Sequence, residues 1–170
     1  MNKLRFLLMP VVVVSFALAN GSGFAQGSLK EQATGTWSLV SFDIIAADGS
    51  KKPVFSPKPK GTLFLATNGR YAMMIVDPER PKKWSAKSRE GASVEELASA
   101  ARGLVAQFGE WSVDEKGKTL IRKNEGALNP LAAGREQIVP IVVSGDELRT
   151  TDAVSGVSGG RTETVWRRVK

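Results

Sequence analysis

The sequence predicts an all-β protein, an eight-stranded up-and-down antiparallel barrel with one helix inserted between its third and fourth strands. Three observations favour this fold. Short apolar stretches recur along the chain with turn residues between them. Several of these stretches alternate apolar and polar residues, as half-buried strands do. Long and short connections between the stretches also alternate, which is typical of a closed ring of antiparallel strands.

The pattern indicates eight strands. Tyr71, Met73 and Ile75 share one face of a strand, and Trp111 and Val113 share one face of another. This many short strands in a chain of 170 residues is typical of a barrel or a sandwich. The predicted strands cover residues 35–45, 61–67, 69–76, 109–114, 119–123, 136–143, 147–151 and 162–169.

The connections place the loops at two unequal ends. The first, third, fifth and seventh connections are long, whereas the second, fourth and sixth are tight turns that contain glycine. Alternate connections of an up-and-down sheet lie at opposite ends, so we expect a long-loop end and a short-turn end. Closure into a ring removes exposed sheet edges. Eight strands leave an interior that side chains fill or that holds one small ligand.

One segment, 93–108, has helical periodicity instead. Its apolar residues recur every three or four positions, and Ser93 with Glu96 has the spacing of a capping box. Gly109 would let the chain leave the helix. The helix would lie at the long-loop end, where it would cover either the outer wall of the barrel or its mouth.

The N-terminus has the layout of a secretory signal peptide over residues 1–25. Lys3 and Arg5 precede an apolar run of about 14 residues, which is too short to span a bilayer comfortably. We expect cleavage after Ala25, with Ala19 as the second choice and an uncleaved membrane anchor as the alternative. Residues 26–34 would form a lead and residues 35–170 one barrel domain. The protein would then be periplasmic or secreted, in a bacterium.

Composition excludes several kinds of chemistry. The chain has no His and no Cys, so a Ser-His-Asp triad, a thiolate nucleophile and a disulfide are excluded, as are ordinary zinc and haem sites. No pair of carboxylates has a spacing that indicates catalysis. We expect no metal and no cofactor, and these counts favour a binding protein over an enzyme. The basic residues form no basic helix, so we expect no nucleic-acid partner.

Several short motifs resemble those of the bacterial lipocalin-like domain family. Gly35-Thr36-Trp37 opens the first strand, and Trp166-Arg167-Arg168 stands in the last. The others are Pro59-Lys60-Gly61, Asn68-Gly69-Arg70-Tyr71, Arg80-Pro81, Gly109-Glu110-Trp111 and Gly145-Asp146-Glu147-Leu148. The resemblance covers roughly residues 33–169 and implies a barrel and a small-ligand pocket, without a defined activity.

The resemblance also implies how the barrel closes. In lipocalins, an Arg of the last strand packs over the Trp of the Gly-x-Trp motif. Either Arg167 or Arg168 could do so here, and we expect Arg168 because it shares a face with Trp166. Gly35, Trp37 and Arg168 would thus close the short-turn end. The helix departs from the family pattern, since true lipocalins place theirs after the eighth strand.

Aromatic, Met and amide side chains are the candidate ligand-binding residues. An apolar cavity with one or two polar anchors is the usual make-up of a small-molecule site. Tyr71 would supply a hydroxyl and Gln137 an amide. The alternative is that these side chains simply fill the barrel. The candidates are Phe64, Tyr71, Met73, Phe108, Trp111 and Gln137.

Basic loops at the long-loop end give the candidate ligand its charge. The two segments 46–60 and 77–90 hold nine basic and four acidic residues, a net charge of +5. We expect Lys58, Lys60, Arg80 and Lys82 to attract a small hydrophobic anion to the mouth. The same charge suits contact with an anionic membrane surface or another envelope component, or simple solubility.

The prediction is therefore a monomer that is exported and binds a small hydrophobic anion. Two alternatives from other classes stay open. One is an envelope interaction module with a packed barrel, and the other is a barrel enzyme that acts on a lipid-like substrate.

Overall fold

The computed structural model describes residues 27–80, 85–155 and 157–170. The predicted signal peptide and Lys82 lie outside the described residues. The strands are β1 (Gly35–Ile45), β2 (Lys51–Pro53), β3 (Lys60–Leu65), β4 (Arg70–Val76), β5 (Leu104–Asp114), β6 (Thr119–Ala127), β7 (Glu136–Ser144), β8 (Glu147–Asp152) and β9 (Thr162–Arg168). The helices are α1 (Leu29–Ala33) and α2 (Val94–Arg102).

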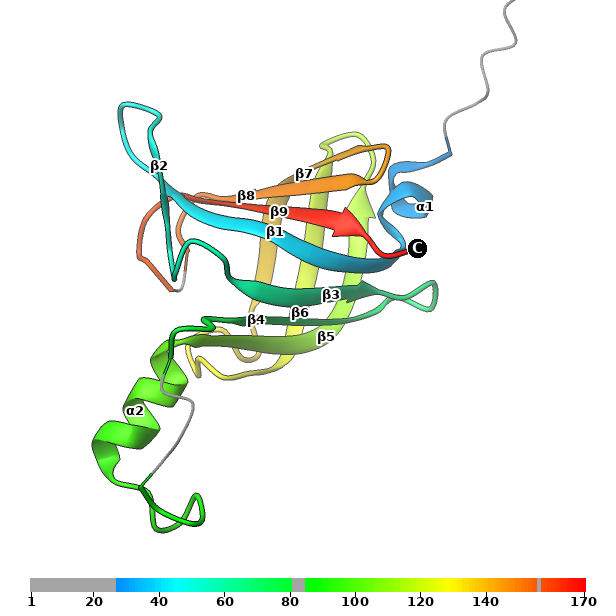
Figure 1. The fold of residues 1–170 in the computed structure, drawn as a ribbon. Helices are drawn as coiled ribbons and strands as arrows, with labels where there is room; N and C mark the ends of the chain where they lie inside the picture. Colours follow the sequence, from blue (N-terminus) through cyan, green and yellow to red (C-terminus); the bar gives the residue numbers. More distant parts are fainter. Residues whose placement is uncertain (1–26, 81–84, 156) are drawn as a thin grey trace, which may run out of the picture.

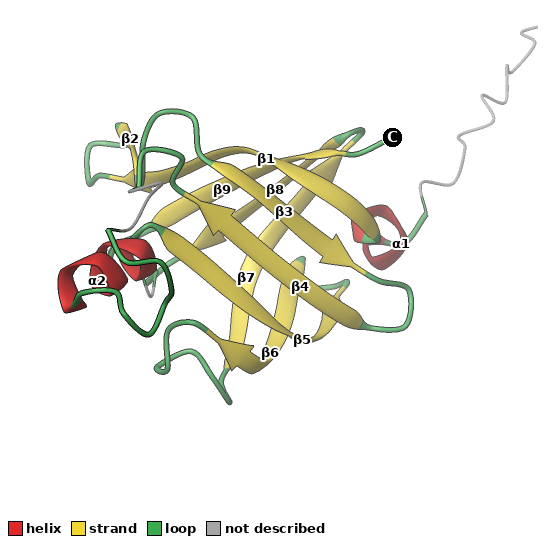
Figure 2. Ribbon diagram, turned by 60° about the horizontal axis from the view of Figure 1, so that its bottom comes forward, coloured by secondary structure: helices red, strands yellow, loops and turns green. Residues whose placement is uncertain are grey.

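Eight of the strands close into an antiparallel barrel. Each pairs with the next in the order β1-β3-β4-β5-β6-β7-β8-β9, and β9 returns to pair with β1. The short strand β2 adds to β1 outside this ring. Tight turns join β3 to β4, β5 to β6 and β7 to β8, whereas the other connections are long. Figures 1 and 2 show α1 at the short-turn end and α2 and β2 at the long-loop end.

Helix α2 differs from the expectation in length and position. It begins at its N-cap Ser93, whose capping box with Glu96 is present, but it ends at Arg102 rather than at Phe108. Residues from Leu104 onwards join β5, because there they pair with β4 from Val76 to Arg70. Strand β2 was not predicted, and α2 therefore follows the fourth strand of the chain instead of the third.

Most of the helix stands clear of the barrel, and only its last turn reaches the mouth. None of its residues is buried, and it extends away from the barrel in both ribbon views. Helix α1, also unpredicted, is shorter but contributes to the core, because Ala33 is fully buried.

The core fills the short-turn half of the barrel. Its largest side chains are three tryptophans, Trp37, Trp111 and Trp166, with leucines from β3, β6 and β8 between them. Each is the inward member of an alternating strand. This half is packed, so space for a ligand remains only toward the long-loop end.

A charged cluster holds β2, β8 and β9 together on the outside of the barrel. Glu163 of β9 accepts hydrogen bonds from Lys51 Nζ of β2 at 2.5 Å and from Arg149 Nη1 of β8 at 2.8 Å. Burial by itself would raise the pKa of the Glu163 carboxyl, but these two cations lower it below its ordinary value. The negative charge of Glu163 therefore links three strands on the outer surface of the barrel.

We predict that Glu163→Gln lowers the free energy of unfolding by about 1 kcal/mol at neutral pH, since both cations are partly exposed. The folded-state pKa of Glu163 is lowered. Its contribution is therefore complete above the unfolded-state pKa of about 4.3 and is lost as the pH falls through the folded-state value. Urea unfolding at neutral pH and at about pH 3 should show a difference between wild type and Glu163→Gln that shrinks in acid.

Glu147→Gln, which removes the more exposed partner of Arg149, is the control with a smaller effect. An equal difference at both pH values would contradict the prediction.

Candidate functional site

The short-turn end of the barrel is closed by Trp37 and Arg168. The Trp37 ring is fully buried, and its Nε1–H donates to the Ala33 carbonyl at 2.8 Å. The Arg168 guanidinium lies 4.1 Å from the centre of that ring. It also donates to the Thr34 carbonyl at 2.9 Å and to the Gln32 carbonyl. The structure thus places Arg168, and not the exposed Arg167, over Trp37.

Gly35 leaves room for this arrangement. Its φ is +139°, a backbone conformation that side chains disfavour, and a Cβ there would lie 2.8 Å from Arg168 Nη1. Side chains of the first and last barrel strands therefore seal the end of the barrel next to α1.

The interior opens toward the long-loop end as a cavity of about 290 Å³. That is about twice the volume of a cavity that holds one benzene molecule. Inward side chains of seven barrel strands line it, together with the last turn of α2 and the connections that follow β6 and β8. The apolar members include Phe42, Met73, Ile75, Leu104, Val105, Leu128 and Val157, and the polar ones include Gln107, Arg122, Gln137, Thr150, Asp152 and Thr162.

An amide network lies along one side of this interior. Gln137 Oε1 accepts from Gln107 Nε2 at 3.3 Å and from Asn124 Nδ2 at 3.4 Å. Asn124 Nδ2 also donates to the Ala132 carbonyl at 3.0 Å, and the Tyr71 hydroxyl donates to Asn124 Oδ1. Burial raises the pKa of the Tyr71 phenol, which therefore stays a neutral donor. Polar groups from four strands thus satisfy one another inside the barrel.

Two of the six candidate ligand-binding residues line the cavity, namely Met73 and Gln137. Tyr71 and Trp111 also point inward but are buried on the short-turn side of it. Trp111 Nε1–H donates to the Ala66 carbonyl at 2.9 Å, at the turn between β3 and β4. Tyr71 joins the amide network through its hydrogen bond to Asn124. It therefore supports the wall of the cavity.

Phe64 and Phe108 point out of the barrel. Phe64 is 49% exposed and lies between the buried Leu63 and Leu65. Phe108 is 51% exposed, and it is three residues from the inward Trp111. An odd separation along a strand puts two side chains on opposite faces. Neither Phe64 nor Phe108 lines the interior cavity, and their expected place in an interior site is corrected.

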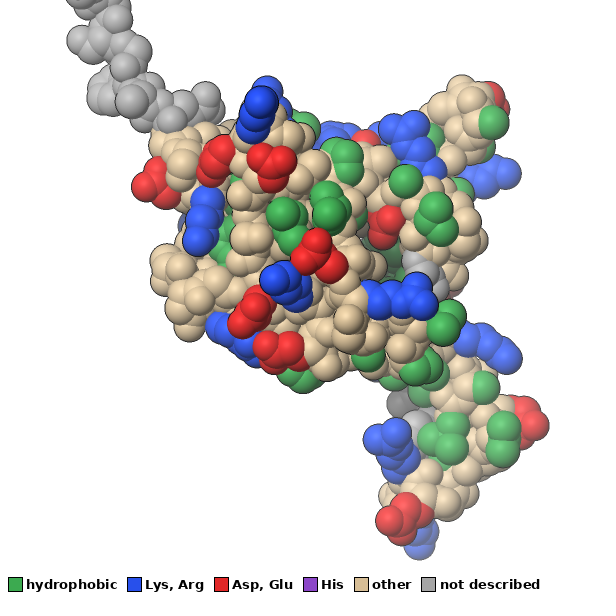
Figure 3. Space-filling view, turned by 180° about the vertical axis from the view of Figure 1, so that it is seen from behind, with side chains coloured by type: hydrophobic (Ala, Val, Ile, Leu, Met, Phe, Trp, Pro, Cys, Tyr) green, Lys and Arg blue, Asp and Glu red, His purple; other side chains and the backbone are tan. Residues whose placement is uncertain are grey.

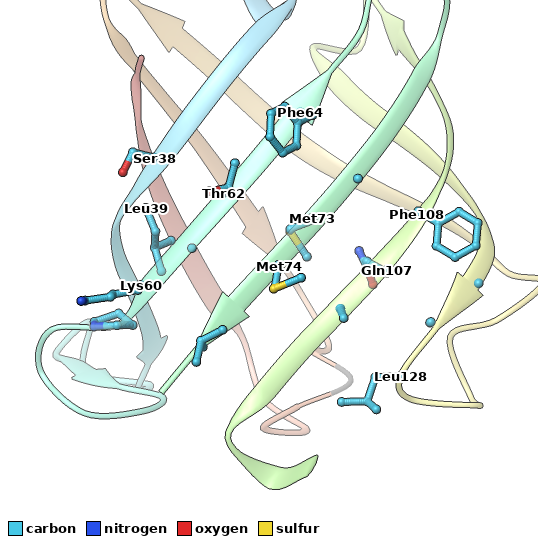
Figure 4. Close-up of a pocket in the computed structure, with 17 residues that line it drawn as sticks. Ser38, Leu39, Lys60, Thr62, Phe64, Met73, Met74, Gln107, Phe108 and Leu128 are labelled. Carbon is cyan, nitrogen blue, oxygen red and sulfur yellow. The ribbon is translucent and has the colours of Figure 1, made fainter. Parts of the chain in front are cut away.

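The two phenylalanines instead lie on a groove in the outer wall, of about 1020 Å³. Figure 4 shows Phe64 and Phe108 on this wall, with Met74, Leu128 and Lys60 nearer the long-loop end. Small outward residues, Ala72 and Ala106, hollow the surface between them, and the Phe108 ring lies against Gly126. The larger of the two concavities is therefore outside the barrel.

Of the basic residues expected at the mouth, the three that the structure describes do not line the interior cavity. Lys60 is exposed on the outer groove, and Lys58 lines neither concavity. Arg80 Nη1 donates to the Ala100 carbonyl at 3.4 Å and so joins its loop to α2. On the face shown in Figure 3, lysines and arginines alternate with acidic side chains. The cations that do line the cavity are Arg102 at its mouth and Arg122 inside.

Comparison with known protein families agrees with this geometry. The model of the lipocalin-like domain matches residues 34–169, nearly all of the described chain. The chain belongs to the lipocalin-like domain family. No curated protein matches it significantly.

Sequence reasoning about this lipocalin-like domain missed Arg122 and Gln107. The signal was present, since Arg122 is two residues from Leu120 and Gln107 is four residues from Trp111, which places each pair on one face. A charged residue on the same strand face as an apolar one could have pointed to this position. Within the described ranges, no group of three His, Cys, Asp or Glu side chains could hold a metal ion. No helix there is long and apolar enough to cross a membrane.

Proposed function

We propose that this lipocalin-like domain binds one small, mainly hydrophobic, anionic molecule in the interior cavity. The observation that carries the proposal is the division of the barrel into a packed half and an open half. Trp37, Trp111 and Trp166 fill the short-turn half, while about 290 Å³ stays unfilled beside Phe42, Met73 and Val105. Scaling from a cavity of about 150 Å³ that holds benzene, the ligand has about twelve non-hydrogen atoms.

The expected charge of the ligand follows from the charge of the chain. The net charge is +7, of which Lys3 and Arg5 belong to the proposed signal peptide. An excess of positive charge raises the local concentration of anions near the protein. We propose export to a bacterial periplasm or beyond, cleavage after Ala25 and a monomeric state. The mass of the exported protein would then correspond to a chain that starts at Gln26.

The outer groove supports a second candidate, a surface for an envelope partner or a membrane. Its solvent-exposed surface carries Phe64, Met74 and Phe108 next to Lys60. Contiguous apolar surface of this kind marks interaction sites in many proteins. The interior cavity remains the better-supported ligand site because it is enclosed by strands and carries converging polar groups.

We predict that Val105→Trp lowers the affinity for decanoate at least tenfold, because the larger ring fills the cavity mouth. Isothermal titration calorimetry of the purified protein would measure this. Phe64→Ser with Phe108→Ser, which strips only the outer groove, is the matched control and should leave the affinity unchanged. The opposite result, loss in the double variant alone, would move the site to the outer groove. A wild-type protein that binds neither decanoate nor 1-decanol would overturn the proposed function.

A further inference from the structure

Arg122 is a buried cation inside the barrel. It lies on the inward face of β6, its residue surface is 6% exposed, and its side chain lines the interior cavity. Burial lowers the pKa of the guanidinium, but arginine keeps its proton in proteins. The barrel therefore contains a positive charge with little water around it.

The protein provides this charge with few acceptors. Nη1 of Arg122 donates to the Met73 sulfur at 3.5 Å, and sulfur is a weak acceptor. The Nε–H is buried and has no partner among the described residues. None of the ion pairs among the described residues includes Arg122. A guanidinium carries five N–H donors, so most of them have no strong acceptor among the residues that the structure describes.

Two polar groups of the cavity wall near Arg122 are already engaged. The Oε1 atom of Gln137, which pairs with Arg122 across β6 and β7, accepts from Gln107 and Asn124. Asp152 also lines the cavity and attracts Arg122 electrostatically, but it is beyond ion-pair distance. Its Oδ1 accepts from the Val154 backbone N–H at 3.1 Å. Neither group therefore accepts a hydrogen bond from the guanidinium among the contacts of the described residues.

We propose that Arg122 binds the carboxylate of a small apolar monocarboxylate whose tail lies toward the long-loop end. The inference rests on the proposed ligand site and names the ligand class for it. A carboxylate takes two parallel N–H···O bonds from a guanidinium fork, which suits the free donors of Arg122. One buried cation with Asp152 nearby disfavours a dianion. Phe42, Ile75 and Val105, which also line the cavity, would contact the tail.

The experiment compares decanoate with 1-decanol, which has the same chain and one oxygen fewer. Calorimetric titration at neutral pH would use wild type, Arg122→Met and Arg167→Met. Methionine keeps the length of the side chain without its charge. Arg167 is exposed on β9, so Arg167→Met removes the same net charge away from the cavity. Thermal unfolding of each variant would show that the fold is kept.

Wild type and Arg167→Met should bind decanoate about ten- to a hundredfold more tightly than 1-decanol, as a charge-assisted pair of hydrogen bonds provides. Arg122→Met should lose this preference while it still binds 1-decanol. Equal binding of both compounds by wild type, or an unchanged preference in Arg122→Met, would overturn the assignment and leave the cavity site standing. Decyl phosphate bound as tightly as decanoate would also overturn the choice of a monocarboxylate. Wild type that binds no probe would overturn the site itself.

Discussion

Replacing Trp37 with alanine is expected to lower the free energy of unfolding by about 3–5 kcal/mol. The indole is fully buried, bonds the end of α1 through Ala33 and supports the guanidinium of Arg168. Its loss would leave a cavity, an unpaired carbonyl and an arginine without its stacking partner. Because α1, β1 and β9 all meet at this ring, their contacts should weaken together. Equilibrium unfolding in urea would measure the change.

Two variants separate the parts of this effect. Trp37→Phe keeps an aromatic ring beneath Arg168 but loses the Nε1–H bond, so it should cost about 1–2 kcal/mol. Arg168→Met should cost more than Arg167→Met, because only Arg168 stacks on the ring and bonds the Thr34 carbonyl. A loss below about 1 kcal/mol in Trp37→Ala would mean that this end of the barrel is held by other contacts.

Replacing Gly109 with alanine is expected to cost about 3 kcal/mol or more. A Cβ at this position would lie 2.0 Å from the Lys123 carbonyl oxygen and 2.8 Å from the Glu125 nitrogen. Both atoms belong to the backbone of β6, which cannot move without breaking its pairing with β5. Overpacking usually costs about 1–3 kcal/mol, and a clash with backbone lies at the upper end.

The cause of this close approach is a β-bulge. The pairing shifts between Phe108 and Gly109, so that Phe108 faces Gly126 while Gly109 faces Asn124, and Glu125 is left over on β6. Gly160→Ala is the control, since the nearest atom to its Cβ is Ser158 Oγ at 4.0 Å. It should change the free energy of unfolding by less than about 0.5 kcal/mol. Thermal unfolding of both variants would test the pair, and a Gly109→Ala protein as stable as wild type would contradict the bulge geometry.

Arg122 illustrates a cost that the proposed binding site would impose on the fold. Burying a cation without a close partner opposes folding, whereas the Trp and Leu side chains of the opposite half favour it. A chain selected for stability alone would place an apolar residue at this position. That conflict with the general pattern of the inner face is itself a reason to look for function there.

The sequence alone predicted those strands in which the alternation of apolar and polar residues agrees with the strand pairing in the barrel. Tyr71, Met73 and Ile75 alternate without interruption, and all three face inward in the barrel. The predicted helix was wrong after Arg102, because Leu104, Val105 and Phe108 suit a helical face as well as a strand. The ladder with β4 decides the matter, since a strand there satisfies backbone groups of both elements.

The candidate site was predictable only in part. Met73 and Gln137 line the cavity as their strand faces indicate. Lys60 and Arg80 do not. Lys60 opens β3 on its outward face, and Arg80 lies in a long loop, whose course depends on what it packs against and not on a local period. Their net charge could be counted from the sequence, but their distance from the cavity could not.

The amino-acid sequence by itself determined that this chain is an eight-stranded barrel with unequal ends, because alternation and connection length are local properties. The resemblance to the lipocalin-like family also implied that Trp37 and an arginine of the last strand meet, and ring closure does bring those two strands together. Only the tertiary structure decided that the packed core stops half-way and that Arg122 is buried without an ion pair to another described residue. Those two properties depend on side chains from many strands at once, and each strand contributes only a few inward residues to that shared space.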